Sequence, residues 1–451
     1  MATLIIRPQK TQLTGVTTVP GDKSISHRAV MLGALAQGSS AVRNWLPAGD
    51  TLATLDAMRA LGVEVSVREH SKLAWDLTIR GQGLSGLRAP SDPLNCRNAG
   101  TCMRLLSGIM AGQTFPAILD GSEQLRRRPM GRIIRPLRQM GASIEADHER
   151  APLRFRPARL TGVDYRLPVA SAQVKSAILL AGLYAAGPIR IMEPGPTRDH
   201  TERLLEAMGV KVEKDDDWLK MQGAGEAGTK RQVAGWQRIL KPLDLAVPGD
   251  MSSAAFLLVA GATVPHSQIT IKDVGQNQTR TGLQDILTAM GARLEIGNER
   301  LTGGESLADL TIYFDELHAS AVSGRTVVRA IDEFPIWAVA ATQAAGESQL
   351  HDAAELRVKE VDRISLLATE LGKMGANIDG HPDGMTISGP TPLRGAQVDS
   401  HGDHRLAMAL AVAGLVASSP TVLGDAGCIA DSFPGFVEVM RSLGANIEWS
   451  E

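Results

Sequence analysis

The chain has few aromatic residues and almost no net charge. Phenylalanine, tyrosine and tryptophan make up 4% of its 451 residues, which leaves little material for base-stacking platforms or aromatic sugar clefts. Its 47 Lys and Arg residues nearly balance 49 Asp and Glu residues, so the net charge is −2. Because no general basic field would attract nucleic acid or a membrane surface, an anion site must be a local cluster of cations.

Cysteine and uninterrupted apolar sequence are also scarce. Cys96, Cys102 and Cys428 are an odd number without C-x-x-C spacing, which argues against a disulfide framework or a cysteine zinc site and favours the reducing cytoplasm. The uncharged stretches 251–271 and 406–424 each contain a proline and many small residues, so we expect buried helices rather than membrane spans. The apolar run near the amino terminus is too short for a signal peptide.

An internal repeat runs through the chain. A hydrophobic residue, Gly, a small residue, any residue and an aliphatic residue recur at residues 61–65, 140–144, 208–212, 290–294, 374–378 and 443–447. Each copy closes a helical pattern, where a left-handed Gly stops the helix before a strand, and these helices are predicted over 51–61, 132–140, 200–208, 279–290, 361–374 and 436–443. Ala-rich segments predict a second, buried helix in each unit, over 25–36, 101–111, 172–185, 252–262, 335–345 and 405–417. The expected architecture is therefore six units, each with two helices and several strands.

The six units also form two similar halves. The sequence VPGDKS at 19–24 returns as VPGDMS at 247–252, which predicts two halves of three units with a changeover near residues 240–248. The second copy has Met251 where the first has Lys23. Because the turn is duplicated but the charge is not, Lys23 is predicted to serve chemistry rather than the scaffold.

The first copy of this motif begins a helix with cations. A predicted strand over 14–19 ends at a Pro-Gly pair, and Ser24 stands where we expect an N-cap. Lys23 and Arg28 then lie at or in the first helical turn, where the backbone dipole disfavours a cation by about 0.3–1 kcal/mol. An anion bound between them would remove the conflict.

The same conflict recurs at three more predicted helix starts. Thr101 is expected to cap a helix that carries Arg104 near its beginning, Arg198 lies just before another helix, and Arg405 opens a third. The basic run 126–128 fits a solvated loop and anion binding equally well. Because conflicts of this kind tend to mark functional sites, the pattern predicts a ligand with several negative charges.

Two carboxylates accompany these cations. Lys359 and Arg363 are four residues apart, which predicts that they share a helix face, with Glu360 in the same helix and salt bridges to Glu355 as the alternative account. Asp332 precedes a Phe-Pro pair, so a helix cap and a catalytic carboxylate are both open for it.

The familiar nucleotide and metal motifs are missing. Asp22 separates Gly21 from Lys23, so the motif is not a P-loop, and the sequence has no HExxH, GxSxG or Rossmann fingerprint in a strand-to-helix context. His27, His200 and His404 lack partners at metal-ligand spacing, so we expect them to form hydrogen bonds rather than to bind a metal.

Taken together, the motifs resemble the 5-enolpyruvylshikimate-3-phosphate synthase (EPSP synthase) family of transferases. The likeness is very specific and spans residues 19 to 436, and a Ser-Ala-Gln triplet at 171–173 is similar to that of a bacterial subgroup. The matching motifs, in chain order, are PGDKSISHR, RNAGTCMRLLSG, RRRPMGR, ASAQVKSAILLAGL, TRDHTERLLEAMG, IDEFPI, LRVKEVDR, GDHRLAMA and SFPGF.

The resemblance implies an α/β (α+β) fold, the two-domain enolpyruvyl transferase fold. Each domain would contain three copies of a βαβαββ unit in an inside-out α/β arrangement. One domain is expected over 21–245 and the other over 1–20 plus 246–451, with the active site in the cleft between them. The family acts in the cytoplasm in aromatic amino-acid biosynthesis, is the target of glyphosate, and implies a monomer.

The family reaction transfers the enolpyruvyl group of phosphoenolpyruvate to the 5-hydroxyl of shikimate 3-phosphate through a tetrahedral intermediate, with release of phosphate. No metal or organic cofactor is implied. By resemblance, the residues that would hold phosphoenolpyruvate are Lys23, Gly100, Arg128, Arg363 and Arg405. The residues that would hold shikimate 3-phosphate are Lys23, Ser24, Arg28, Ser171, Gln173, Arg198, Asp332 and Lys359.

The resemblance also implies the acid–base roles. Asp332 would take the 5-hydroxyl proton, and Glu360 with Lys23 would handle protonation at the vinyl carbon. One departure concerns Asp431, which stands where many members carry a Lys that binds phosphoenolpyruvate.

Three rival functions remain at this point. The related UDP-N-acetylglucosamine enolpyruvyl transferase shares the fold but uses a loop cysteine as acid, and the corresponding loop here, 120–128, has none. A non-catalytic repeat protein that binds a polyanion would not need Asp332 or Glu360. An RNA-end-processing enzyme of related units fits poorly with neutral charge and scarce aromatics.

Overall fold

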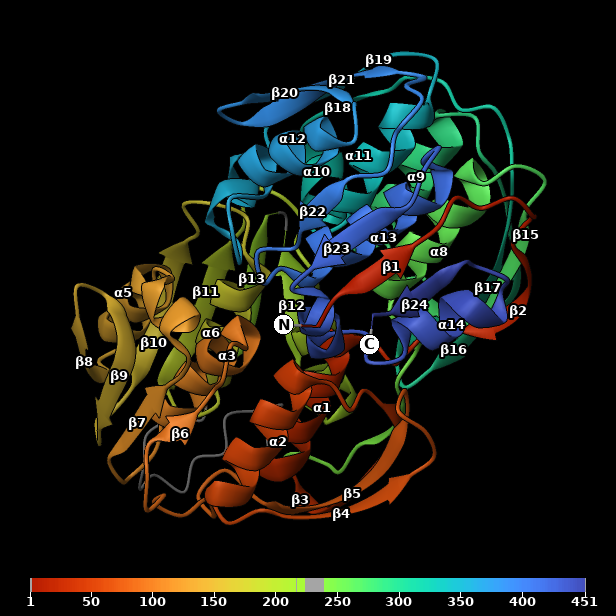
Figure 1. Ribbon diagram of the computed structural model, residues 1–451. Helices are drawn as coiled ribbons and strands as arrows, with labels where there is room; N and C mark the ends of the chain where they lie inside the picture. Colours follow the sequence, from red (N-terminus) through yellow and green to blue (C-terminus); the bar gives the residue numbers. More distant parts are fainter. Residues whose placement is uncertain (1, 216, 224–238, 451) are drawn as a thin grey trace. The chain divides into compact units, whose positions relative to one another are not determined.

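The structure, a computed structural model, describes residues 2–215, 217–223 and 239–450 (Figure 1). Two compact units divide the chain: one is Gly21–Val247 with Thr302–Gly304, and the other is Met1–Pro20, Pro248–Leu301 and Glu305–Glu451. We call the first the inner-segment unit and the second the terminal unit. The changeovers expected near residues 20 and 245 lie within a few residues of these bounds.

Each sheet in the described residues has four strands, and there are six such sheets, one for each predicted repeat. In every sheet a first strand runs parallel to a second. A third strand then pairs antiparallel with the second, and a fourth with the third. Two main helices accompany each sheet, with short additional helices in some repeats, so each repeat is a βαβαββ unit, as predicted.

The three repeats of the inner-segment unit share this order of elements. The first consists of β14 (Asp244–Ala246), α1 (Lys23–Leu35), β3 (Gln37–Trp45), α2 (Gly49–Ala60), β4 (Glu64–Glu69) and β5 (Trp75–Gln82). The second consists of β6 (Leu94–Asn95), α3 (Gly100–Ala111), β7 (Ala117–Asp120), α4 (Glu123–Arg127), α5 (Gly131–Gln139), β8 (Ser143–Asp147) and β9 (Arg150–Arg156). The third consists of β10 (Thr161–Arg166), α6 (Ala172–Gly182), β11 (Ala186–Met192), α7 (His200–Ala207), β12 (Val212–Asp215) and β13 (Trp218–Gln222).

The terminal unit repeats the pattern. Its first repeat consists of β2 (Thr14–Thr18), α8 (Met251–Thr263), β15 (Gln268–Gly275), α9 (Gly282–Ala289), β16 (Arg293–Thr302) and β17 (Glu305–Tyr313). The second consists of β18 (Ala321–Val322), α10 (Arg325–Ala330), α11 (Phe334–Gln343), β19 (Gly346–Leu350), η1 (Ala354–Val358), α12 (Arg363–Lys373), β20 (Asn377–His381) and β21 (Gly384–Gly389). The third consists of β22 (Gln397–Asp399), α13 (His404–Val416), β23 (Thr421–Gly424), η2 (Ala426–Asp431), α14 (Phe436–Ser442), β24 (Ile447–Trp449) and β1 (Leu4–Ile6).

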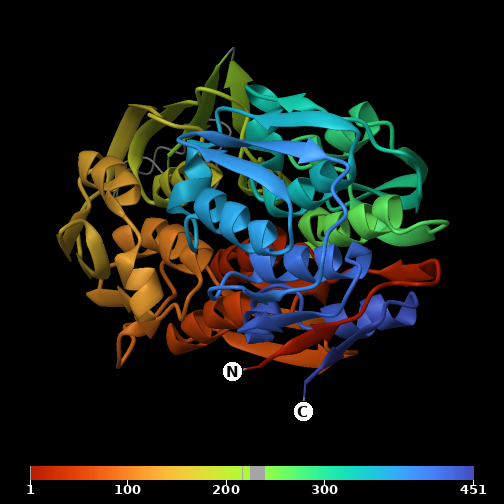
Figure 2. The same ribbon diagram turned by 45° about the horizontal axis from the view of Figure 1, so that its top comes forward.

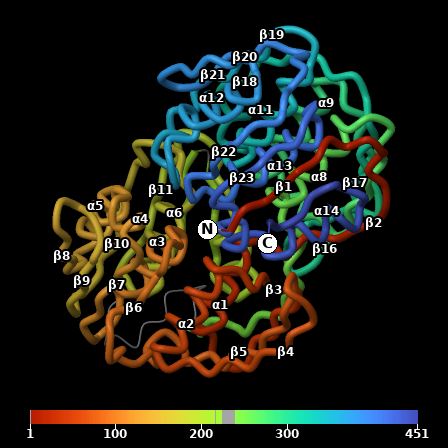
Figure 3. Tube along the Cα trace, in the orientation of Figure 1, coloured from red at the N-terminus to blue at the C-terminus, as the bar shows by residue number. Residues whose placement is uncertain are grey.

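The amino-terminal strand β1 completes the last sheet. It lies between β23 and β24 and pairs antiparallel with both, with Leu4 opposite Leu423 on one side and Trp449 on the other. Figures 2 and 3 show this red strand beside blue segments from the other end of the chain. The terminal unit therefore depends on residues from both ends of the sequence.

The predicted repeat glycines end their helices in the predicted way. Gly62, Gly141, Gly209, Gly291, Gly375 and Gly444 all have φ between 89° and 98°. Each follows the C-cap residue of α2, α5, α7, α9, α12 or α14. Residues with a Cβ rarely adopt this left-handed conformation, so Gly lets the chain turn directly from helix to strand.

The Ala-rich helices form the interior of each unit. In the terminal unit α8, α11 and α13 contact one another, and in the inner-segment unit α3 contacts both α1 and α6. Every residue of α8 is buried, because its small side chains let neighbouring helices approach closely. The sheets lie outside these helices, which confirms the inside-out arrangement (Figure 1). Among the described residues, no helix is long and apolar enough to cross a bilayer.

Candidate functional site

The amino end of α1 carries the first cation of the candidate site. The cap is Asp22, whose Oδ1 accepts a hydrogen bond from the Ile25 amide at 2.8 Å, so the prediction that Ser24 caps this helix was wrong. Lys23 is the first helical residue, and its Nζ lies 3.0 Å from Asp50 Oδ2. No local sequence pattern indicated Asp50, whose carboxylate offsets part of the unfavourable placement of Lys23.

Arg28 lies in the second turn of α1 rather than the first, which corrects the prediction. Its guanidinium is buried and donates to Thr201 Oγ1 at 2.6 Å, to Ser176 Oγ at 2.8 Å and to the Ser24 carbonyl at 2.9 Å. These bonds come from α7, α6 and α1. Because three elements hold it, the Arg28 cation has a fixed place within the unit.

His27 is a buried histidine close to the cations at this helix end. Burial, and then the positive charges of Lys23 and Arg28, hold the pKa of His27 well below its ordinary value. The imidazole is therefore neutral at physiological pH, and its Nδ1 lies 2.6 Å from Thr54 Oγ1. His27 thus forms a structural hydrogen bond, as predicted.

The side-chain amide of Gln173 joins the residues predicted on α3 and α6. Gln173 Oε1 accepts from Arg104 Nη1 at 2.5 Å, and Gln173 Nε2 donates to Thr101 Oγ1 at 2.9 Å. Ser171 caps α6 by accepting from the Val174 amide. The cap of α3 is Ala99, which makes no side-chain bond, so the prediction that Thr101 caps it was wrong. Thr101 instead supports Gln173.

Gly100 leaves room for two guanidinium groups at the start of α3. A Cβ at this position would lie 3.0 Å from Arg128 Nη1 and 3.5 Å from Arg104 Nη1. Arg128 is buried, and its Nη2 donates to Asn98 Oδ1 at 3.4 Å. The basic run at 126–128 therefore contributes one buried cation to the cluster rather than three solvated ones, since Arg126 pairs with Asp120 on the surface.

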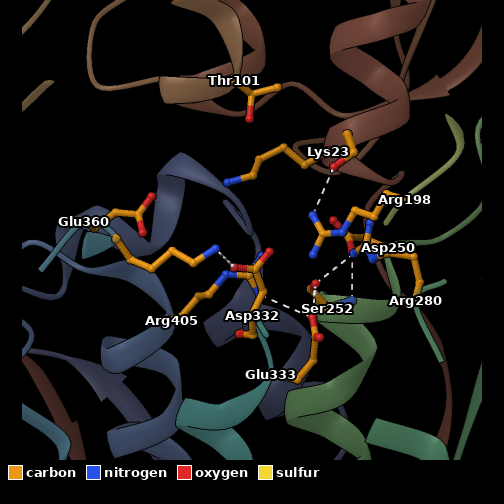
Figure 4. A network of polar contacts seen from close by, with 12 residues as sticks. Lys23, Thr101, Arg198, Asp250, Ser252, Arg280, Asp332, Glu333, Glu360 and Arg405 are labelled. Carbon is orange, nitrogen blue, oxygen red and sulfur yellow. Dashed lines mark hydrogen bonds and ion pairs between the residues drawn. The ribbon is translucent and has the colours of Figure 1, made fainter. Parts of the chain in front are cut away.

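Arg198 precedes α7 as predicted and lies beside the α1 end. Its Nη1 donates to Ser24 Oγ at 3.4 Å (Figure 4). The cations of the inner-segment unit thus gather at the amino ends of α1, α3, α6 and α7. Helix amino ends and cations both favour bound anions, so this cluster is a candidate anion site.

A buried ion triad supports the segment that leads to Arg198. Lys175 Nζ lies 2.6 Å from Glu202 Oε1 and 3.0 Å from Glu193 Oε2, and the lysine side chain is 1% exposed. Glu193 also accepts a hydrogen bond from Thr197, the residue before Arg198. The triad joins α6, α7 and the connecting segment.

In the terminal unit, three cations surround one carboxylate. Asp332 Oδ1 lies 3.3 Å from Lys359 Nζ and 3.4 Å from Arg363 Nη1. Asp332 Oδ2 lies 3.8 Å from Arg405 Nη2, and the Asp332 carbonyl accepts from Arg405 Nη1 at 3.2 Å (Figure 4). Cations this close favour the ionised carboxylate. Asp332 is therefore the carboxylate shared by the three cations of this cluster.

Arg363 links the second and third repeats of this unit. It is the first residue of α12, its Nε donates to Asp403 Oδ2 at 2.8 Å, and its Nη2 donates to Glu360 Oε2 at 2.7 Å. Burial alone would lower the pKa of Arg363, but the carboxylates of Asp403, Glu360 and Asp332 outweigh it and raise the pKa. Arg363 remains a cation at any pH at which the protein is folded.

The helix predicted to carry Lys359, Glu360 and Arg363 is interrupted. Lys359 is the C-cap of the short helix η1, Glu360 lies in the following turn, and α12 begins only at Arg363. The shared-face prediction for Lys359 and Arg363 was therefore wrong. Lys359 and Arg363 therefore reach Asp332 from two different backbone segments rather than from one helix face.

Three further residues of the terminal unit escaped the sequence analysis: Ser252, Arg280 and Glu333. They form a buried polar network that adjoins Arg405 (Figure 4). The duplicated motif at 247–252 was the available signal for Ser252. Among the described residues, no group of three His, Cys, Asp or Glu side chains could hold a metal ion.

Comparisons with known proteins identify the family. The EPSP synthase family (3-phosphoshikimate 1-carboxyvinyltransferase) matches residues 8–440. A 3-phosphoshikimate 1-carboxyvinyltransferase of Citrifermentans bemidjiense is 48% identical over 445 residues, covering 98% of this chain and 99% of the relative. One from Acidithiobacillus ferrooxidans is 47% identical over 448 residues, covering 99% of each.

Solved structures agree with this assignment. An EPSP synthase from Acinetobacter baumannii covers 100% of both chains with a TM-score of 0.86 and 41% identity. The enolpyruvyl transferase NikO from Streptomyces tendae has a TM-score of 0.79 at 18% identity, with 100% of this chain and 99% of that chain covered, and shows the shared fold. The chain belongs to the EPSP synthase family.

Proposed function

We propose that the chain carries out the reaction of its family with the two clusters of residues described above. This reaction transfers the enolpyruvyl group of phosphoenolpyruvate to the 5-hydroxyl of shikimate 3-phosphate and releases phosphate. The observation that carries the proposal is the carboxylate of Asp332, which lies within 4 Å of the cationic groups of Lys359, Arg363 and Arg405. A base among anion-binding cations suits a hydroxyl nucleophile and a substrate that carries phosphate and carboxylate.

Shikimate 3-phosphate is assigned to the helix ends of the inner-segment unit. Its phosphate and carboxylate would bind Ser24, Arg28, Ser171, Gln173 and Arg198. The fixed guanidinium of Arg28 supports this assignment, because charge-assisted hydrogen bonds are strongest where the donors need no rearrangement. The proposal further assigns Lys23, Lys359 and Asp332 to this substrate, with Asp332 at the 5-hydroxyl.

Phosphoenolpyruvate is assigned to cations of both units. Lys23, Arg128, Arg363 and Arg405 would hold its phosphate and carboxylate, and Gly100 would let it approach the backbone. The buried guanidinium groups of Arg128, Arg363 and Arg405 support this, since arginine forks match both anionic groups in geometry. The proposal requires residues of both units to act on the same substrates.

The chemistry divides between two carboxylates. The 5-hydroxyl oxygen attacks C2 of phosphoenolpyruvate while its proton passes to Asp332, and Glu360, with Lys23, supplies a proton to C3, which becomes a methyl group. In the tetrahedral intermediate the C2–O bond to phosphate then breaks, the departing phosphate takes up the proton held by Asp332, and a methyl proton returns to Glu360 as the enol ether forms. The cations stabilise charge at both stages, so the residues act by general acid–base and electrostatic catalysis.

The oligomeric state and location complete the proposal. We infer a monomer in the cytoplasm. Cys96, Cys102 and Cys428 are free thiols, which is typical of proteins in a reducing compartment.

Phosphate release from phosphoenolpyruvate tests the function. Release should require shikimate 3-phosphate and should proceed without added metal. Release with UDP-N-acetylglucosamine instead would assign the related transferase activity, and no release with either acceptor would refute the proposal. Solvent-proton exchange into the methyl group of the intermediate tests the acid: exchange undiminished in Glu360→Gln would contradict the role of Glu360, and Lys23→Met tests the contribution of Lys23.

A further inference from the structure

In the terminal unit, a buried series of polar contacts extends to Arg405. Arg280 Nη2 donates to Asp250 Oδ1 at 2.9 Å and to Ser252 Oγ at 2.8 Å. The Ser252 hydroxyl in turn donates to Glu333 Oε1. Glu333 Oε1 lies 3.7 Å from Arg405 Nη1 (Figure 4). The contacts therefore lead without a break from the first turn of α8 to a residue of the candidate site.

Glu333 is the unusual member of this series. It is 1% exposed, and among the described residues its Oε2 has no hydrogen-bond partner. It occupies the N-cap position of α11 but makes no side-chain cap bond. A buried carboxylate is costly unless cations and donors surround it, so the Ser252 hydroxyl, itself bonded to Arg280, and the Arg405 cation account for its presence.

The corresponding helix ends of the other unit differ in an informative way. In the inner-segment unit the N-cap of α3 is Ala99, which has no carboxylate, while in the terminal unit the N-cap of α11 is Glu333. Ser24 follows Lys23 at the duplicated turn, and Ser252 follows Met251. In the first half, Ser24 and the nearby cations can thus bind a ligand. In the second half, the equivalent Ser252 already bonds Glu333, a carboxylate of the protein itself.

We propose that Glu333 is a built-in anionic ligand of the terminal unit that positions Arg405 for phosphoenolpyruvate. Glu333 attracts Nη1 of the Arg405 guanidinium, while Nη2 lies 3.8 Å from Asp332 Oδ2. Arg280 and Ser252 fix Glu333 in place. Glu333 is a positioning residue, and the assignment of phosphoenolpyruvate to Arg405 rests on the proposed function.

Chemical rescue tests this proposal. Glu333→Ala removes the carboxylate and leaves a small space beside the Ser252 hydroxyl and the Arg405 cation. We expect kcat/KM for phosphoenolpyruvate to fall by about 100-fold, as misplacement of a substrate-binding group can cause. Sodium formate, titrated against sodium chloride at equal ionic strength, should restore at least a tenth of the lost activity. It should also raise the Tm of Glu333→Ala and leave that of the unaltered protein unchanged.

Two control variants make the rescue specific. Glu370→Ala removes a carboxylate that is equally buried in the same unit but bonded to Lys373 and His401, so formate should not change its activity. The double variant Ser252→Ala/Glu333→Ala lacks the hydroxyl donor, so its response to formate should be weaker. Rescue of Glu370→Ala to the same extent would overturn the proposal.

Glu333→Gln keeps the volume and removes the charge, which tests the proposal even if Glu333→Ala does not fold. We expect its KM for phosphoenolpyruvate to rise about tenfold, with a smaller change in kcat and in the KM for shikimate 3-phosphate. An unchanged or lower KM for phosphoenolpyruvate would overturn the positioning role. The formate effect on Tm is read without turnover, so its absence contradicts this inference, whereas inactivity of the unaltered protein contradicts the proposed function.

Discussion

Replacing Lys175 by Met should destabilise the inner-segment unit strongly and in a pH-dependent way. The lysine is 1% exposed and neutralises two carboxylates, Glu193 and Glu202, at 3.0 and 2.6 Å. Met fills a similar volume but leaves both carboxylates without their cation. Breaking a buried ion pair by removing one partner costs about 3–5 kcal/mol, and we expect a loss in the free energy of unfolding of this size near pH 7.

The pH dependence follows from Glu202. Burial raises the pKa of Glu202, although the charge of Lys175 opposes this effect. Without Lys175 the pKa rises further, so the folded variant binds a proton that the unfolded chain releases. Proton binding of this kind stabilises the folded state at low pH, and the benefit is lost as pH rises through the folded pKa. The deficit of Lys175→Met should therefore be smaller at pH 5 than at pH 8.

Denaturant unfolding followed by tryptophan fluorescence at both pH values provides the measurement. In the unaltered protein the Lys175 ammonium keeps its charge across this pH range, because the two carboxylates outweigh burial and raise its pKa. The double variant Lys175→Met/Glu202→Gln removes one of the two stranded charges and should recover part of the stability. A loss below about 1 kcal/mol at pH 8, or a deficit that grows toward pH 5, would refute the reasoning.

Three further predictions concern the candidate site. Asp332→Asn should lower kcat by about 10²–10⁴-fold while the protein still binds shikimate 3-phosphate in calorimetry; near-normal turnover would favour a polyanion-binding protein without catalysis. Gly100→Ala places a Cβ 3.0 Å from Arg128 Nη1, so the guanidinium must move, and steady-state kinetics should show the KM for phosphoenolpyruvate raised about tenfold at nearly unchanged Tm. Asp50→Asn removes the carboxylate beside Lys23 and should lower Tm slightly, because it restores the conflict with the helix dipole at about 0.3–1 kcal/mol; calorimetric scans that show a higher Tm would contradict this.

Much of the fold could be predicted because its signals are local. A left-handed glycine followed by a small residue, any residue and an aliphatic residue marks the end of a helix and the start of a strand. This pattern occurs six times in the chain. The Ala-rich helices could be recognised in the same way. Helix caps were harder, because Asp22 and Ser24 are both good N-caps and only the backbone geometry decides between them.

Residues whose role depends on distant partners could not be predicted from local pattern. Two acidic residues precede Phe334. Asp332 faces three cations, whereas Glu333 is buried against Ser252, which lies 81 residues away in sequence. Nothing in the local sequence distinguishes the two. Likewise, charges four residues apart indicated one helix at Lys359 and Arg363, whereas the structure places Lys359 at the end of η1 and Arg363 at the start of α12. The site residues were predicted through resemblance, and their contacts with distant partners could not be predicted in that way.

The sheet that β1 completes imposes an order on folding during translation. β1 is synthesised long before its partners β23 and β24, because the rest of both units lies between them in the sequence. The inner-segment unit is almost continuous in sequence, so it can fold while synthesis proceeds. The nascent amino-terminal segment must meanwhile wait unpaired, and its short length and the charged Arg7 and Lys10 beside it limit premature association with other chains. The terminal unit therefore closes last, once β23 and β24 have been made and can pair with β1.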